Sequence, residues 1–333
     1  MPFSVSRYRS EVFRPTLFWF AVFSLCWMTL LLFVGGTTTS IEAGMAFLDW
    51  PLSNGSLNPE GWTEQSDQLA EHSHRLIGMK MGLLSLILAG VCWVFEARKI
   101  VRNLAFLLVA VIVAQGVLGG LRVLFDQLNT GADTNAVAQI FLVLHATGAQ
   151  VTLCILVTLV LMLSKSWIEG ERSFEGQDSR SLRFWSKAAI VVLFFQLILG
   201  AMVRHLKAAA IFGDYFPFLT GTWMGWESIF PARISIYTLV HYFHRVGAIV
   251  VTLVLLRFFM KAWAYPFVRK NHGNWIMILA AAITFQIFLG AMVVITLRNP
   301  HVATLHTLLG ASILAITWAL TVCFHRTRLA TDS

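Results

Sequence analysis

The sequence predicts an all-α membrane protein in which eight transmembrane helices form two pseudo-repeated four-helix bundles. First, 57% of its 333 residues are hydrophobic and only 13% are charged, and the mean hydropathy is +0.71. Soluble domains carry about 25% charged residues, so an ordinary soluble domain is excluded. Second, eight apolar runs are long enough for the ~30 Å hydrocarbon layer, which takes roughly 20 helical residues. Third, the same short motifs recur in both halves.

The apolar runs lie at residues 17–34, 76–97, 104–121, 137–163, 188–203, 237–256, 275–296 and 303–323. We expect the fifth helix to be the shortest. The first run follows Arg7, Arg9 and Arg14, but it is too long for a signal-peptide core and no small-residue cleavage site follows. We therefore expect a permanent helix. The polar stretch before it is too short for an organelle transit peptide, which favours a bacterial plasma membrane.

The basic residues predict the orientation. With the N-terminus inside, most of the 25 Lys and Arg residues fall in inner segments, whereas the outer loops hold only Arg122, Arg204, Lys207, Arg233 and Arg298. By the positive-inside rule both termini are cytoplasmic. Basic loops beside anionic lipid then explain the net charge of +8, so we expect the lipid bilayer and no nucleic acid as a partner.

Repeated motifs indicate a duplicated unit. Gln-x-x-Leu-Gly segments end at Gly119, Gly200 and Gly290, near the outer ends of the third, fifth and seventh runs. Small residues there let a helix approach a flat ligand, although simple helix packing explains them equally well. The outer loop with Trp50-Pro51 has a counterpart with Phe216-Pro217. We expect a parallel repeat with domains at 1–168 and 188–333, joined by a cytoplasmic linker at 169–187.

Four histidines mark the same depth in the two halves. Each even-numbered helix enters from outside and carries one of them early: His74, His145, His244 and His306. An ionisable residue inside the membrane is costly and marks a functional site by default. Neutral imidazole is a common axial ligand of haem iron, and bundle cores hold such cofactors. The pattern predicts two haem sites toward the outer leaflet, His74 with His145 and His244 with His306.

Other interpretations of these histidines stay open. A single intramembrane histidine often serves as a hydrogen-bonding group between helices. Zinc or copper is less favoured, because the two halves do not both offer an additional carboxylate or thiolate at that depth. The remaining histidines lie at predicted helix ends or in loops, where we expect solvated or interfacial side chains: His72, His205, His272, His301 and His325.

The two halves differ one turn before the first histidine of each pair. Glu71 precedes His74, whereas His241 precedes His244. A carboxylate there can exchange protons or stabilise developing charge, which makes the N-terminal half the candidate reactive site. Glu71 can instead favour the helix N-terminus or pair with Arg75.

The basic residues beside these histidines have two readings. Arg75 and Arg245, and also Lys80, could hold haem propionates through charge-assisted hydrogen bonds, or extend to the membrane interface. The thiols of Cys26, Cys92, Cys154 and Cys323 lie within or at the ends of apolar runs. We expect them to be buried and free of disulfides.

Most of the chain resembles the haem A synthase family. The resemblance rests on Glu71-x-x-His74-Arg75, the Asp49-Trp50-Pro51 loop, His145, His244-Arg245 and His306 on eight helices. It implies an oxidoreductase that converts haem O to haem A by hydroxylating the C8 methyl group twice, after which the gem-diol loses water to give a formyl group. It further implies that His74 and His145 flank the substrate haem O near Glu71, and that His244 and His306 ligate a haem b.

The resemblance implies partners as well: a haem O synthase, the cytochrome oxidase assembly machinery and an electron-transfer partner that the sequence does not identify. It leaves a homo-oligomer open. Many family members carry a cysteine pair in an outer loop, and the corresponding loops here contain none. A thiol-linked role in haem transfer is therefore in doubt. The alternative function is a di-haem, cytochrome b-like protein that carries electrons or haem without catalysis.

Overall fold

The computed structural model describes residues 9–127, 135–170, 180–220 and 226–329. Within these ranges the regular secondary structure is helical apart from two isolated β-bridges. Eight of the described helices are long and apolar enough to cross a membrane. This confirms the predicted all-α fold class and the number of spans. The chain divides into two compact units, Met1–Glu171 and Arg172–Ser333.

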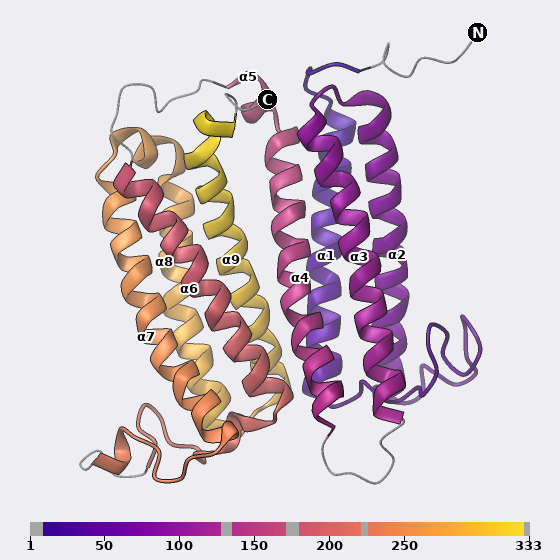
Figure 1. Cartoon of the computed structure of the whole chain (residues 1–333), viewed down its shortest axis with the longest axis vertical. Helices are drawn as coiled ribbons and strands as arrows, with labels where there is room; N and C mark the ends of the chain where they lie inside the picture. Colours follow the sequence, from indigo (N-terminus) through magenta and orange to yellow (C-terminus); the bar gives the residue numbers. More distant parts are fainter. Residues whose placement is uncertain (1–8, 128–134, 171–179, 221–225, 330–333) are drawn as a thin grey trace. The chain divides into compact units, whose positions relative to one another are not determined.

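Unit 1 is a four-helix bundle (Figure 1). Its long helices are α1 (Pro15–Ser40), α2 (Ser66–Phe95), α3 (Lys99–Gln127) and α4 (Ala136–Leu163), and the short α5 (Lys165–Glu169) follows. Helix α1 packs against α2 and α4, and α3 packs against the same two helices. The four helices therefore form a ring in which α2 and α4 lie diagonally opposite each other.

Unit 2 repeats this ring with its own four helices (Figure 1). They are α6 (Arg180–His205), α7 (Ile236–Trp263), α8 (Pro266–Ile295) and α9 (Pro300–Leu329), with the 3-10 turns η2 (Ala208–Ala210) and η3 (Trp226–Ser228) between α6 and α7. Helices α6 and α8 each pack against α7 and α9, which makes α7 and α9 the diagonal pair. In the predicted linker, residues 171–179 lie outside the described residues.

Two helix boundaries differ from the apolar runs. Helix α2 begins at Ser66, well before residue 76, so that Glu71 and His74 lie inside the helix and not at its mouth. Helix α6 begins at Arg180 and has 26 residues, so the fifth span shares the shortest length with α1 and is not shorter than it. Hydropathy detects only the part of a helix in hydrocarbon, whereas the helical hydrogen bonds continue through polar residues beyond it.

Local sequence explains where several helices start. Pro15 and Pro266 occupy the first turn of α1 and α8, where no N–H partner is needed. Asn135 accepts hydrogen bonds from the first N–H groups of α4, and Ser235 forms a capping box with Thr238 at α7. Asn299 does the same at α9, accepting from the backbone N–H groups of the residues that follow.

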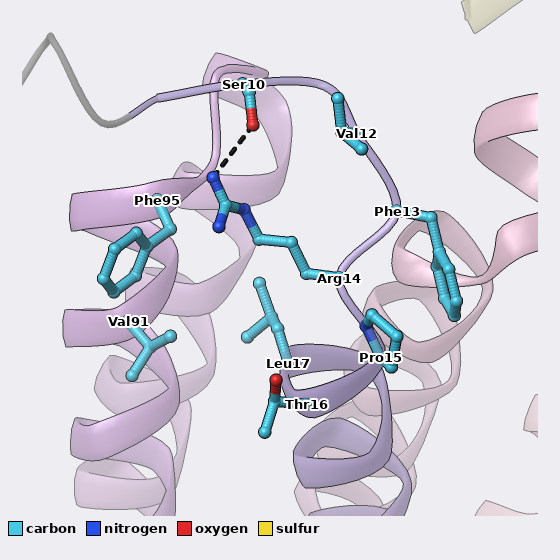
Figure 2. Close-up of a pocket in the computed structure, with 9 residues that line it drawn as sticks. All are labelled: Ser10, Val12, Phe13, Arg14, Pro15, Thr16, Leu17, Val91 and Phe95. Carbon is cyan, nitrogen blue, oxygen red and sulfur yellow. Dashed lines mark hydrogen bonds between the residues drawn. The ribbon is translucent and has the colours of Figure 1, made fainter.

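One cavity lies at the end of unit 1 where α1 begins and α2 ends. It has a volume of about 620 Å³ and is lined mainly by apolar side chains, among them Val12, Leu17 and Val91 (Figure 2). Arg14 spans it, donating a 2.9 Å hydrogen bond to the hydroxyl of Ser10. Because Gly35 and the histidine-bearing site are near the other end of α1, this cavity is separate from the candidate site.

Candidate functional site

His74 and His145 face each other inside unit 1. They lie on the diagonal helices α2 and α4, with ring centroids 6.3 Å apart and ring planes at 85°. His145 donates from Nδ1 to the backbone carbonyl of Gln115 over 3.0 Å, which leaves Nε2 as the nitrogen with a free lone pair. Nδ1 of His74 is buried and has no hydrogen-bond partner. The structure thus brings together the histidine pair that the sequence predicted.

Glycines on the neighbouring helices give these rings their space. A Cβ atom added at Gly35 of α1 would lie 2.6 Å from Cε1 of His74, which is too close for any real Cβ. A Cβ atom at Gly119 of α3 would lie 3.5 Å from Cε1 of His145. Each imidazole therefore packs directly against the backbone of an adjacent helix.

The same arrangement occurs in unit 2 around His244 and His306. A Cβ atom at Gly200 or at Gly290 would lie 3.1 Å from Cε1 of the facing imidazole. The amide Nε2 of Gln196 donates to the backbone carbonyl of His244 over 2.8 Å and lies 3.1 Å from its Nδ1. His244 and His306 lie on the diagonal helices α7 and α9.

The histidine pair of unit 1 fits haem iron. A metal–nitrogen bond of about 2 Å on each side, plus about 1 Å from each nitrogen to its ring centre, separates two axial imidazoles by roughly 6 Å. The observed 6.3 Å agrees with this separation. Haem supplies four ring nitrogens, so the protein needs to add only two ligands. Within the described residues no group of three or more His, Cys, Asp or Glu side chains gathers to hold a metal ion.

Glu71 is buried beside this site, with 4% of its surface exposed. Its Oε1 forms an ion pair with Arg75 Nη2 at 2.6 Å, and its Oε2 accepts a 3.0 Å hydrogen bond from the backbone N–H of Phe47. Both carboxylate oxygens are therefore engaged. Of the two roles that the sequence left open, the contact with Arg75 is present in the structure.

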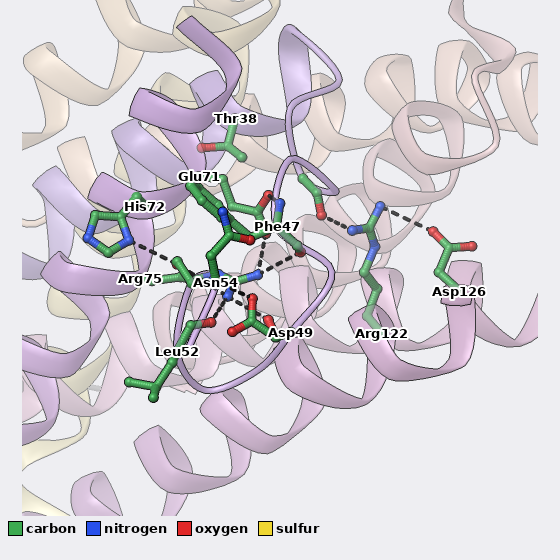
Figure 3. Close-up of polar contacts among 12 residues, drawn as sticks. Thr38, Phe47, Asp49, Leu52, Asn54, Glu71, His72, Arg75, Arg122 and Asp126 are labelled. Atoms are coloured by element: carbon green, nitrogen blue, oxygen red, sulfur yellow. Dashed lines mark hydrogen bonds and ion pairs between the residues drawn. The ribbon is translucent and has the colours of Figure 1, made fainter. Parts of the chain in front are cut away.

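Arg75 holds the outer loop in place (Figure 3). Its Nη1 donates to the carbonyl oxygens of Asp49 at 2.7 Å and of Leu52, and its Nη2 donates to the carbonyl oxygen of Phe47 at 3.1 Å. Backbone carbonyls thus accept hydrogen bonds from both terminal nitrogens of Arg75, the groups that were predicted either to bind haem propionates or to extend to the membrane interface. In this structure the guanidinium ties residues 47–52 to helix α2.

The loop carries its own anchor at Asp49. The carboxylate accepts 2.8 Å hydrogen bonds from the backbone N–H groups of Asn54 and Gly55. Gly55 has φ = 70°, a left-handed conformation that costs glycine little, and this lets the chain turn back. Burial by itself would raise the pKa of Asp49, but these N–H groups and the charge of Arg75 outweigh it and hold that pKa below its usual value.

Arg245 has the matching role in unit 2. Its Nη1 donates to the carbonyl of Phe218 over 2.9 Å and its Nη2 to that of Tyr215 over 3.1 Å. Its Nε donates to Nε2 of His241 over 3.2 Å. His241 is 3% exposed and packs against the ring of Phe212. It therefore supports Arg245 from the position that Glu71 has relative to Arg75.

The prediction for His72 was wrong. Expected to be solvated or interfacial, its side chain is only 2% exposed and contacts the hydroxyl of Ser53 at 2.9 Å and the carbonyl of Leu57 at 3.2 Å. The outer loop folds over the first turns of α2, which hydropathy cannot reveal. His301 is exposed as expected, whereas three other histidines are partly buried: His205, His272 and His325.

Lys80 and two of the four cysteines lie at exposed or partly exposed positions. Lys80 is exposed and its ammonium lies 5.8 Å from the ring centre of Trp27. All four cysteines are free, as expected. Cys92 and Cys154 are buried, but Cys26 is exposed on α1 and Cys323 is partly exposed, so the expectation of burial was wrong for these two.

Sequence reasoning missed two glycines. Gly35 seats His74, and Gly120 makes room for the indole of Trp50, whose ring atoms would overlap any Cβ there. Neither residue ends a Gln-x-x-Leu-Gly segment, so this motif does not identify them. The signal that could have found them is the Gly-Gly pair, which stands near the outer end of the first and third helices at Gly35 and Gly119.

Comparisons with known proteins agree with one another. A family model for cytochrome oxidase assembly protein, COX15-CtaA, matches residues 18–318. The Heme A synthase of Lysinibacillus sphaericus is 28% identical over 302 residues, which cover 87% of this chain and 89% of the relative. Heme A synthases of Halalkalibacterium halodurans and Anaplasma marginale are each 25% identical, over 85% and 87% of this chain and 88% and 89% of the relatives.

Proposed function

The chain belongs to the COX15-CtaA family of cytochrome oxidase assembly proteins, and from this membership we propose that it is a haem A synthase. The reaction is the oxidation of the C8 methyl group of haem O to a formyl group. Two successive hydroxylations give a gem-diol, which then loses water. The product is haem A for terminal oxidases. Relatives named Heme A synthase, similar over most of their length, support this proposal.

The observation that carries the proposal is the histidine pair of unit 1 with a carboxylate one turn away. His74 and His145, whose ring centres are 6.3 Å apart, would hold the substrate haem O between them. His244 and His306, each seated against a glycine, would hold a haem b in unit 2. A bound haem b supplies one-electron transfer chemistry.

Glu71 is the proposed proton-handling group. A carboxylate close to the reacting carbon can accept a proton or stabilise positive charge that develops there. Both oxygens of Glu71 are hydrogen-bonded, so proton transfer requires one contact to be given up. The bond from the neutral Phe47 N–H is weaker than the ion pair with Arg75. We therefore expect Oε2 to be the reactive oxygen and Arg75 to keep the carboxylate in position.

The multi-pass architecture suits a bacterial inner-membrane enzyme. On the distribution of basic residues, both termini face the cytoplasm and the histidine pairs lie toward the outer leaflet. A haem O synthase would supply the substrate, the cytochrome oxidase assembly machinery would take the product, and a separate partner would exchange electrons.

Co-expression tests the activity. The chain is produced together with a haem O synthase in a host that lacks haem A, and the extracted haems are separated by chromatography. We expect haem A to appear only when both proteins are present. If only haem O and haem B are found, while the purified chain is folded and loaded with haem, the synthase proposal is wrong.

One observation favours the alternative of a non-catalytic di-haem protein. His241 supports Arg245 as Glu71 supports Arg75, so the carboxylate that distinguishes the two halves also has a purely structural explanation. A carrier of electrons or haem would need the haem ligands and these structural contacts, but no proton-handling carboxylate. The same co-expression experiment separates the two functions, because a carrier leaves the haem O methyl group unchanged.

A further inference from the structure

All four helix pairs that carry a histidine share one packing arrangement. One helix of each pair carries the glycine that faces the imidazole. One turn before that glycine, the same helix carries a residue whose side chain contacts the partner helix. The contact is made at a second glycine, which lies one turn after the histidine. This residue and its facing glycine are Leu31 and Gly78, Gln115 and Gly148, Gln196 and Gly247, and Gln286 and Gly310. Three of the four positions hold glutamine, and only helix α1 has an apolar residue there.

The glutamines of unit 2 bring polar atoms to the imidazoles. Nε2 of Gln196 lies 3.1 Å from Nδ1 of His244, and Nε2 of Gln286 lies 3.5 Å from Nε2 of His306. The Oε1 atoms of both glutamines are buried and have no hydrogen-bond partner. Turning the Gln196 amide would place Oε1 beside Nδ1 of His244. At His306, whose Nδ1 is buried without a partner, both the Gln286 amide and the imidazole would have to turn. Each turned amide would give up its hydrogen bond to the backbone carbonyl of the same histidine.

The histidines of unit 1 differ from each other. His145 donates from Nδ1 to the backbone carbonyl of Gln115 over 3.0 Å. Nδ1 of His74 is buried without a partner, and Leu31 has no side-chain polar atom to offer it. His74 is therefore the only one of the four histidines with neither a hydrogen bond to its ring nor a glutamine beside it among the described residues.

This difference bears directly on metal ligation. An imidazole that binds iron through Nε2 carries its proton on Nδ1 and usually donates it to a carbonyl or carboxylate. The hydrogen bond fixes the ring and raises the basicity of the ligand. Loss of such a partner typically costs 10–100-fold in metal affinity. An imidazole without one is the weaker axial ligand.

We propose that Leu31 makes His74 the exchangeable ligand of the four, so that unit 1 releases its haem faster than unit 2. The inference rests on the proposed function, in which His74 and His145 hold a haem. A site that takes in haem O and delivers haem A must let the macrocycle leave, whereas a resident haem b has no such need. Leu31 is thus a positioning residue that acts through His74.

Haem loss from the full-length protein tests this role. The chain is loaded with haem b at both sites, mixed with excess apomyoglobin as acceptor, and followed by absorbance. We expect two phases, of which His74→Ala abolishes the faster. Leu31→Gln should slow that fast phase by roughly 10–100-fold, because Gly78 leaves room for the amide as Gly148 does for Gln115. Leu31→Met, similar in size but without an acceptor, is the matched control.

A second variant tests the same idea in unit 2. Gln196→Leu should accelerate the slow phase by a similar factor and leave the fast phase unchanged. The inference is overturned if Leu31→Gln behaves like Leu31→Met, if Gln196→Leu leaves the slow phase as it was, or if haem leaves in one phase. If the fast phase depends on His74 but not on Leu31, the haem site stands and only this inference fails. If no haem depends on His74, the proposed site fails with it.

Discussion

Arg75 and Arg245 make matching contacts in the two units. Each donates to the carbonyls of the residue two before and the residue one after a proline. In unit 1 this proline is Pro51 and Arg75 makes both bonds from Nη1, whereas in unit 2 it is Pro217 and Arg245 uses Nη2 and Nη1, respectively. The donor roles of the two nitrogens differ, but the acceptor positions coincide. Each arginine is supported from four residues earlier on its own helix, by Glu71 or by His241. Both guanidinium groups thus tie an aromatic-proline loop to a histidine-bearing helix.

Arg75→Ala should therefore release the outer loop of unit 1. The substitution leaves the buried carboxylate of Glu71 without its counter-charge, and breaking a buried pair in this way costs about 3–5 kcal/mol. We expect a lower thermal midpoint and faster proteolytic cleavage within residues 41–65. The measurement is limited proteolysis of the purified protein with mass identification of the cut sites.

Lys99→Ala serves as its control, because Lys99 is exposed and lies away from the loop. Arg245→Ala should expose the loop around Pro217 and leave residues 41–65 protected. Equal cleavage of residues 41–65 in Arg75→Ala and the unmodified protein would show that the guanidinium does not hold the loop.

Glu71→Gln separates the chemical role of this side chain from its structural one. The amide oxygen can still accept from Phe47 N–H, but the group can no longer act as a carboxylate base. Because general acid–base groups contribute typically 10²–10⁴-fold, we expect haem A formation to fall by about 100-fold or more while haem stays bound. Haem A yield in the co-expression host is the measurement.

Glu71→Ala should likewise retain haem and block or stall oxidation, but with the loop loosened as well. Proteolysis of residues 41–65 shows whether the loop remains in place in each variant. An undiminished haem A yield from Glu71→Gln would remove Glu71 from the chemistry and leave it only its contact with Arg75.

The histidine pairs could be predicted from sequence because burial of an ionisable group in a membrane is rare and the two halves repeat it. The arginine contacts could not. Arg75 and Arg245 bind backbone carbonyls, and every residue carries such a carbonyl, so no side-chain pattern identifies the acceptors. His72 was misplaced for a related reason, since its burial depends on how the loop folds over α2. Helix ends were missed where polar residues continue the helix.

His244→Ala and His306→Ala test the ligands of unit 2. Removing either imidazole leaves the iron with one protein ligand, so we expect loss of the low-spin b-type spectrum of that haem. The measurement is the reduced-minus-oxidised absorbance of the purified protein. His301→Ala is the control, because His301 lies near the start of α9, the helix that carries His306, and its side chain is exposed. A full b-type spectrum in either ligand variant would contradict the assignment.

Glycine substitutions in unit 1 test how closely the imidazoles pack against the neighbouring helices. Alanine inside a helix is normally favoured over glycine by about 1 kcal/mol, so any loss must come from the new Cβ atom. At Gly35 that atom would lie 2.6 Å from His74 Cε1, whereas at Gly119 it would lie 3.5 Å from His145 Cε1, an ordinary contact. Gly35→Ala should therefore displace His74 and abolish the fast phase of haem loss, while Gly119→Ala should keep it.

At Gly116 a Cβ would meet nothing within 4 Å, so Gly116→Ala sets the baseline. Equal haem retention in all three variants would mean that His74 does not need the position seen here to bind haem.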